Sequence, residues 1–313
     1  MDKQLLDEVI ACLPQGRTLF HYHRDRYALY LLERKYQQGE LHTLADLRKS
    51  PYKSWLNRPL LKQWQASQGR ADAPLSSLFY QASNQAHDTY LLSLGQWGNP
   101  KATRWQQTSR PGLNLVLHLN LPLQHHRWLT ELGIDNILKL QRYSHPRDRH
   151  RITLAWARID LDLDSNQALI EEVQSDWVRD MPWLFRRARH HLHQGRTEIS
   201  WRNTALDCRQ LLAYEAQLQP LEQTWSEAML TAALWFLQEE IGIREVFYHS
   251  WQTGIAIKRM SQTSPPPRSL YSELPERFCF TLQPEGPCFL ENHFRCKQVK
   301  KQQAPWNWYH WAA

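Results

Sequence analysis

A run of alternating leucines is the feature that most constrains how this chain can fold. Leucine occupies every second position from 113 to 121, and the residues between are Asn114, Val116, His118 and Asn120. Successive side chains of a β-strand point to opposite faces of a sheet. The pattern therefore predicts a strand with one apolar face and one mostly polar face, and hence a sheet to hold it.

Further strands are expected on both sides of the middle of the chain. Residues 151–163 and 168–174 are predicted to form a hairpin around the polar turn at 164–167. Residues 243–250 form an apolar strand, and 278–282 with 288–294 are predicted to form a terminal antiparallel pair. The proline-rich stretch 264–268 predicts a rigid, exposed loop.

Helical patterns flank these strands. The N-terminal region is predicted to be mostly helical, with helices over 27–36, over 44–48 behind an N-cap at Thr43, and over 59–66. Later helices are predicted from Pro182 to about His193 and over 222–241, which ends at Gly242.

These elements predict an α+β fold, with a mainly antiparallel sheet packed with helices behind a helical N-terminal region. The predicted divisions are a helical region over 1–95, an α+β core domain over 96–296, and a basic and aromatic tail over 297–313.

Composition bounds the class of protein. Hydrophobic residues make up 42% and charged residues 22%, which is ordinary globular usage. The sequence lacks an apolar run near the ~20 residues that cross a bilayer, and the N-terminus lacks the pattern of a signal peptide. A cytoplasmic protein without a membrane partner is therefore expected. Cys279, Cys288 and Cys296 with His293 match no common zinc spacing, so no metal or cofactor is predicted.

The net charge of +7 favours polyanionic partners such as nucleic acid or a nucleotide. The predicted N-terminal helices carry a group of basic residues and loosely resemble a helix-turn-helix: Arg48, Lys49, Lys53, Arg58 and Lys62. The alternative is a helical region whose basic face is merely solvated.

The segment Glu171–Trp177 is the strongest candidate for chemistry. In an extended chain Glu172, Gln174 and Asp176 would share one face. The other face would carry Glu171, Val173, Ser175 and Trp177. Two carboxylates and an amide at a strand end could surround a ligand, with one carboxylate as general base. The alternative is a solvated strand whose carboxylates pair with nearby arginines, namely Arg179, Arg186 or Arg187.

A second polar segment, 248–254, ends the strand at 243–250. His249 is a candidate general acid or base because imidazole titrates near neutral pH. Thr253 with Lys258 could hold a phosphate, although the sequence lacks both standard nucleotide-binding glycine motifs. The alternative is a turn with a buried histidine that is hydrogen-bonded to the backbone.

The sequence Glu171-Glu172-Val173-Gln174-Ser175-Asp176-Trp177 resembles the "EIQSDW" motif of domains found in large polyvalent proteins of phages and conjugative elements. The resemblance spans roughly residues 95–260 and includes the segment 248–254. Those hosts are conflict and DNA-transfer systems, so the resemblance implies nucleic-acid or nucleotide-linked substrates; it implies no particular reaction. Val178-Arg179-Asp180 departs from the expected His/Gln-rich continuation, which puts retention of any family activity in doubt.

The resulting hypothesis is an enzyme, or the remnant of one, acting on a nucleotide, nucleic acid or other anionic substrate at this strand end. Its predicted catalytic residues are Glu172, Gln174, Asp176 and His249. Its predicted substrate-binding residues are Ser175, Thr253 and Lys258. The alternative is a basic nucleic-acid-binding or adaptor protein without catalytic activity.

Overall fold

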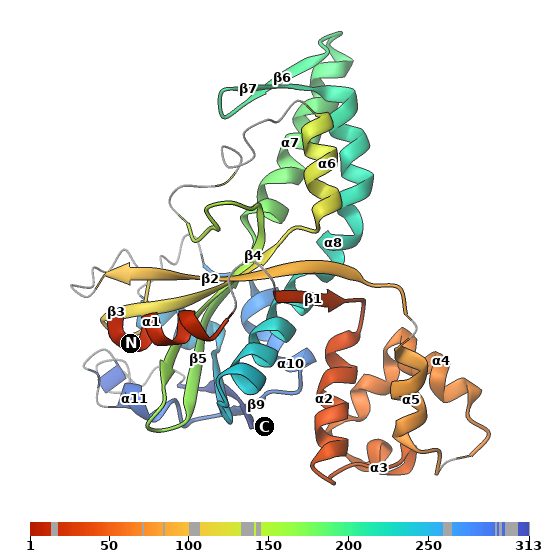
Figure 1. Cartoon of the computed structure of the whole chain (residues 1–313), viewed down its shortest axis with the longest axis vertical. Helices are drawn as coiled ribbons and strands as arrows, with labels where there is room; N and C mark the ends of the chain where they lie inside the picture. Colours follow the sequence, from red (N-terminus) through yellow and green to blue (C-terminus); the bar gives the residue numbers. More distant parts are fainter. Residues whose placement is uncertain are drawn as a thin grey trace.

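An eight-stranded sheet forms the centre of the molecule (Figure 1). The computed structural model describes the chain except residues 14–17, 71, 84, 100–106, 133–140, 142–144, 259–264, 292, 294–295, 298–305 and 313. In spatial order the strands are β1 (Thr18–Tyr22), β2 (Asp88–Asn99), β3 (Gly112–Asn120), β4 (Thr153–Asp162), β5 (Gln167–Gln174), β8 (Glu245–His249), β10 (Trp308–Ala312) and β9 (Thr281–Gln283). Only β5 and β8 pair in parallel among these neighbours, because helices connect them.

The leucine alternation is confirmed. Leu113, Leu115, Leu117 and Leu119 of β3 lie in the main hydrophobic core, together with residues of the long helix α8 (Cys208–Trp235). The opposite face of the sheet carries the polar residues of the same strand. The β4–β5 hairpin is also confirmed, with residues 163–166 as its turn.

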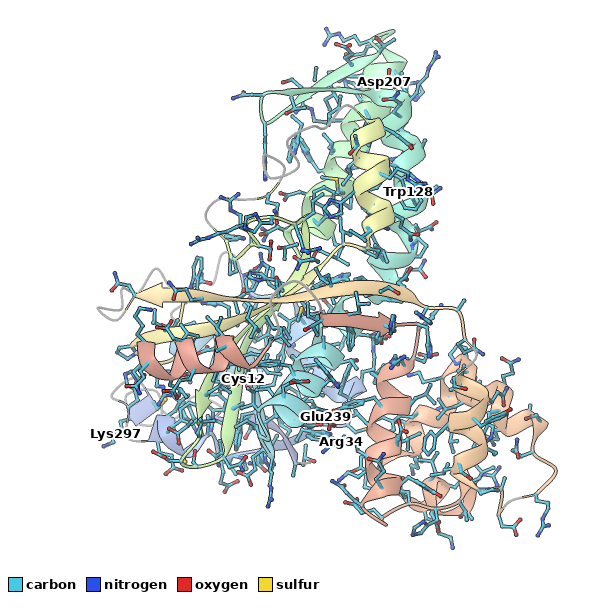
Figure 2. All side chains as sticks on the ribbon, in the orientation of Figure 1. Cys12, Arg34, Trp128, Asp207, Glu239 and Lys297 are labelled. Carbon is cyan, nitrogen blue, oxygen red and sulfur yellow. The ribbon has the colours of Figure 1, made fainter. Side chains whose placement is uncertain are left out.

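The N-terminal helices pack beside the sheet, at the lower right of Figure 1. They are α2 (Arg26–Gln37), α3 (Leu44–Lys49), a 3₁₀ helix (Pro51–Asn57), α4 (Pro59–Ser67) and α5 (Leu75–Ala82), while α1 (Lys3–Cys12) lies alongside β3. The predicted cap is confirmed, because Thr43 forms a reciprocal capping box with Asp46. Figure 2 shows Arg34 beside Glu239, and this ion pair joins α2 to the π-helical turn (Phe236–Glu240) that follows α8.

An arm projects from the sheet at the top of Figure 1. It consists of α6 (Leu123–Glu131), α7 (Asp176–His193), the first part of α8, and a small hairpin of β6 (Glu198–Trp201) and β7 (Thr204–Asp207). Asp207 lies near its tip in Figure 2. α8 continues into a π-helical turn (Phe236–Glu240) at its other end.

Several element predictions are wrong. Residues 1–95 contain β1 and most of β2, so the predicted boundary at 95/96 falls inside a strand of the central sheet. α7 begins at Asp176 rather than at Pro182, since Ser175 caps it, and α8 begins at Cys208, since Asp207 caps it. Each helix contains one proline in its interior, at Pro182 and Pro220.

The C-terminal predictions also need correction. β9 pairs with β10 and not with residues 288–294, of which Cys288–Glu291 form the short helix α11. The predicted tail therefore supplies a strand that lies between β8 and β9. Lys300 and Lys301 lie outside the described residues. Among the described residues, the remaining helices are α9 (Trp251–Lys258), the π-helical turn Ser269–Glu273 and α10 (Leu274–Arg277).

Candidate functional site

The face of the sheet opposite α8 is lined with polar side chains. The strand register places His118, Trp156 and Gln174 in one row, and Val116, Arg158 and Glu172 in the next. Buried polar and charged groups are costly unless they are paired, so their number on this face needs an explanation. The buried polar and charged residues of these strands are Asn114, His118, Asn120, Thr153, Arg158, Asp160, Glu171, Glu172 and His249.

A β-bulge in β5 sets the direction of the two glutamates. Arg158 pairs with Glu172 and Ile159 pairs with Ile170, so Glu171 is the extra residue. A bulge interrupts the alternation of side chains. Both glutamates consequently face the polar side, where Glu172 forms an ion pair with Arg158 and Glu171 faces His249. The prediction that Glu171 and Glu172 lie on opposite faces of the strand is therefore wrong.

Glu171 is the centre of a fully buried cluster. Its carboxylate lies 3.2 Å from His249 Nε2 and accepts hydrogen bonds from the backbone N–H and the hydroxyl of Ser109, each at 2.8 Å. Burial would raise the pKa of Glu171, but the hydrogen bond from His249 and the charge of Lys258 lower it to about 2.

Lys258, the last residue of α9, also belongs to this cluster. It donates to the backbone carbonyl of Glu171, lies 3.7 Å from the carboxylate of the same residue, and donates to the Tyr271 hydroxyl at 3.1 Å. Burial lowers the pKa of Lys258 to about 8. Thr253 is also buried and lies 3.3 Å from His249 Nδ1. The predicted phosphate-binding pair thus serves the protein interior and has no open ligand position.

The cluster does not have the geometry of a serine nucleophile. Ser109 Oγ lies 2.8 Å from His249 Nε2, and the same nitrogen faces the Glu171 carboxylate. Because a carboxylate only accepts, Nε2 carries the proton and cannot take one from Ser109. Both side chains of the Glu171–His249 pair are 0% exposed. We therefore assign the cluster to holding the bulge and the strands in place.

The polar side chains at the C-terminal end of β5 are partly exposed to solvent, unlike those of the Glu171 cluster. His145 Nδ1 lies 2.8 Å from both carboxylate oxygens of Asp176, and the Gln174 amide donates to the same carboxylate at 2.8 Å. Arg179 forms a further ion pair with Asp176. The side chains of His145 and Asp176 are 28% and 16% exposed, so this group reaches solvent where the Glu171 cluster does not.

Asp176 is positioned by the start of α7 and not by the strand. Ser175 is the N-cap, since its hydroxyl accepts from the Val178 N–H, and it also donates to the Leu154 carbonyl. It is therefore a buried structural residue rather than an open ligand group. Burial would raise the pKa of Asp176, but the hydrogen bond and charge of His145 hold it below its usual value.

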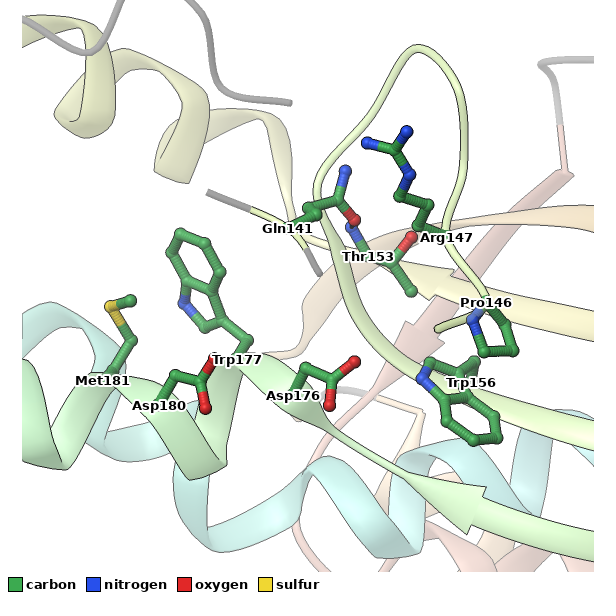
Figure 3. Close-up of a pocket in the computed structure, with 9 residues that line it drawn as sticks. All are labelled: Gln141, Pro146, Arg147, Thr153, Trp156, Asp176, Trp177, Asp180 and Met181. Atoms are coloured by element: carbon green, nitrogen blue, oxygen red, sulfur yellow. Dashed lines mark hydrogen bonds between the residues drawn. The ribbon is translucent and has the colours of Figure 1, made fainter. Parts of the chain in front are cut away.

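A crevice lies beside Asp176 between the start of α7 and β4 (Figure 3). Asp176 and Trp156 face each other across it, and Arg147 stands over the same space in Figure 3. Its free volume is about 10 Å³, roughly what one water molecule needs. It can therefore hold a water or a small part of a ligand, but not a whole substrate.

A larger cleft adjoins the crevice and shares Arg147 with it. This cleft has a volume of about 700 Å³, which is the usual size for a small-molecule site. One wall is formed by His118 and Ser93, and another by the basic loop Arg147–Arg151. The loop is anchored by Asp148, which accepts from the Ser93 hydroxyl at 2.6 Å. Desolvation lowers the pKa of His118 to about 4.

The predicted basic helices surround a second, separate cleft. It has a volume of about 830 Å³ and is lined by Arg48, Lys53 and Lys62 among other residues. Lys49 is exposed nearby. Arg58 lies over the Tyr27 ring, 5.6 Å from its centroid, and so belongs partly to the packing of this region.

The predicted site residues thus divide into two groups. Glu172, His249 and Lys258 belong to the buried charges around the bulge, while Gln174 and Asp176 belong to the open strand end. Sequence reasoning missed the residues that complete both groups: Ser109, His145, Arg158 and Glu171 as a member of the polar face. No sequence signal connects His145 to Asp176, because 31 residues separate them.

Comparison with models of protein families, with curated proteins and with solved structures found no match. Within the described part of the chain, no group of three His, Cys, Asp or Glu side chains is placed to hold a metal ion. None of its helices is both long and apolar enough to cross a membrane.

Proposed function

We propose that this chain is an enzyme that transfers protons on an anionic, phosphate-bearing substrate, with His145 as the general acid or base and Asp176 as the residue that orients it. The observation that carries the proposal is the solvent-reaching His145–Asp176 pair beside a basic cleft. The resemblance to phage and conjugative-element domains agrees with such a substrate but does not establish it.

The hydrogen bonds of the His145–Asp176 pair are arranged in the way that proton transfer requires. A carboxylate at Nδ1 holds the proton on that nitrogen, so Nε2 of the neutral ring accepts a proton. Nε2 of His145 makes no hydrogen bond with a described residue. Gln174 and Arg179 in turn hold the Asp176 carboxylate, so the orientation of the imidazole is supported by two further side chains.

The basic loop supplies the substrate preference. Arg147, Arg149 and Arg151 follow one another at alternate positions and all line the cleft. Guanidinium groups bind phosphate oxygens in pairs. Since Arg147 also lines the crevice beside Asp176, a phosphate held in the cleft would lie next to the His145–Asp176 pair.

The experiment is a turnover screen with purified protein. The probes are 4-nitrophenyl phosphate, bis(4-nitrophenyl) phosphate, nucleoside triphosphates and a single-stranded oligonucleotide, each with and without divalent cations. We expect turnover of at least one, and we expect His145→Gln to lower it by about 100-fold or more, as loss of general acid–base catalysis does.

His190→Gln is the matched control, because His190 is an exposed histidine near the far end of α7. It should leave turnover unchanged. Full activity in His145→Gln, or no turnover of any probe by the folded protein, would count against the proposal.

The second candidate is the non-catalytic nucleic-acid-binding protein. The observation that favours it is the cleft lined by Arg48, Lys53 and Lys62. Phosphate contacts there would make binding fall steeply with salt. The His145–Asp176 pair has no role in a protein that only binds nucleic acid, so we rank this candidate second.

A further inference from the structure

We infer that the substrate is single-stranded nucleic acid and that Trp183 and Trp201, on the projecting arm, form a platform on which its bases stack. This inference deepens the proposed function and rests on it, since it names the class of the anionic substrate. The supporting observation is the course of α7, which begins at Asp176 of the His145–Asp176 pair and contains Trp183 of the platform.

One stripe of α7 connects the two places. Asp176, Asp180, Trp183 and Arg187 are spaced by four, three and four residues, which is the spacing of neighbours on one helix face. The stripe begins at the His145–Asp176 pair and runs outward along the arm (Figure 1). Asp180 is buried between them, so a chain-like ligand that passes over it would contact the pair and the tryptophans together.

The platform has two aromatic rings and two guanidinium groups. The rings of Trp183 and Trp201 are 5.2 Å apart between centroids. Arg187 lies over the Trp183 ring at 4.7 Å and Arg202 over the Trp201 ring at 4.9 Å. Trp183 is 40% exposed, an unusual state for so large an apolar side chain.

This combination matches the chemistry of single-stranded nucleic acid. Bases stack on indole rings and on guanidinium planes, and Arg187 beside Trp183 can also bind phosphate. Residues 181–193 of α7 include Arg186, Arg187 and Arg189 and no carboxylate, and Arg189 forms an ion pair with Glu215 of α8. Asp180, the last acid on the stripe, is neutralised by its ion pair with Arg202 at 3.0 Å.

A duplex would fit this surface less well. Its bases are stacked on one another, so the indole rings could not reach them without melting the helix. A polyanion without bases would use the arginines and leave the tryptophans unused. The tryptophans therefore distinguish single-stranded nucleic acid from other polyanions.

The test is fluorescence anisotropy of a labelled dT15 oligonucleotide with the full chain at low salt. Trp183→Ala should weaken binding by about 10-fold, as loss of one base stack does, and Trp183→Phe should restore most of it. A duplex of the same length and inorganic polyphosphate should compete poorly. Tyr80→Ala is the matched control, because Tyr80 is an exposed aromatic residue on α5.

Binding that depends on Trp183 supports the inference even if the turnover screen fails, so the two proposals can fail separately. The inference is overturned by equal binding of Trp183→Ala, by equal competition from duplex or polyphosphate, or by no binding. It is also overturned if substituting Arg48, Lys49 and Lys53 together abolishes binding while Trp183→Ala does not.

Discussion

At the scale of single residues, two of the three carboxylates of the motif, Glu171 and Asp176, have opposite environments. Glu171 is enclosed by Ser109, His249 and Lys258, whereas Asp176 reaches solvent beside His145. A buried charge is tolerated only when it is paired and hydrogen-bonded. We therefore expect Glu171 to contribute to stability and Asp176 to contribute to activity.

The first prediction follows from the buried Glu171–Lys258 pair. Glu171→Gln or Lys258→Met alone should lower the free energy of unfolding by about 3–5 kcal/mol, because each leaves an uncompensated charge in the interior. Urea denaturation of the two single variants and of the double variant measures this. The double variant should be less destabilised than the sum of the two. Additive losses would show that the two charges are not coupled.

Part of this site was predictable at the residue scale, and part was not. The motif and the strand ending in His249 both carry residues of the polar face. The β5 bulge was not predictable, since nothing in the letters of Glu171 and Glu172 shows where the alternation is interrupted. His145 and Ser109 were missed because only the pairing of distant segments brings them to the site.

At the scale of elements, the junction of β5 and α7 determines which residues face solvent. β5 ends at Gln174, and the hydroxyl of the next residue, Ser175, caps α7. The prediction assumed that Glu172, Gln174 and Asp176 are all extended. The extended backbone ends at Ser175, and Asp176 is the first residue of the helix. The predicted start of α7 at Pro182 was wrong because Ser175 caps the helix seven residues upstream. Pro182 therefore lies inside α7.

The second prediction concerns this cap. Ser175→Ala should lower the free energy of unfolding by about 1–2 kcal/mol, since it removes a cap and a buried hydrogen bond, and should leave oligonucleotide binding intact. Thr43→Ala, which removes the capping box of α3, is the reference for the cost of a cap alone. If Ser175→Ala abolished binding while the melting temperature was unchanged, Ser175 would be a ligand residue after all.

At the scale of the whole molecule, the polar face makes stability depend on pH. Burial lowers the pKa of His118 and of His249 to about 4 in the folded state. In the unfolded chain an imidazole takes up its proton near pH 6.5. The unfolded state thus binds more protons between pH 6.5 and 4, so stability falls as the pH falls through this window.

The third prediction is the size of this effect. His118 and His249 should each contribute a loss of about 2 kcal/mol between pH 7 and 5. Burial also lowers the pKa of His125 to about 4, so it should add to the loss in the same direction. Urea denaturation at the two pH values measures it, and His249→Gln should reduce the difference while His190→Gln should not. A free energy of unfolding that is equal at pH 7 and 5 would contradict the burial of these imidazoles.

The sheet also shows what could be predicted at this scale. The leucine alternation and the hairpin predicted its centre, and the α+β class is confirmed. β1, β2 and β10 were not identified as its strands, because β1 is short and β10 lies in an aromatic tail whose pairing partners are distant in sequence. Such long-range pairing is decided by tertiary contacts and leaves little local signal.

The proposed activity depends most on His145 and Asp176 acting as one unit. The direct measurement is the turnover rate of the best substrate from the screen with His145→Gln, Asp176→Asn and the double variant. Residues that act together are not additive in their loss, so the double variant should be no slower than His145→Gln. Asp164→Asn, an exposed carboxylate on the β4–β5 turn, should be unaffected. Full activity in Asp176→Asn, or losses that multiply in the double variant, would contradict the central claim.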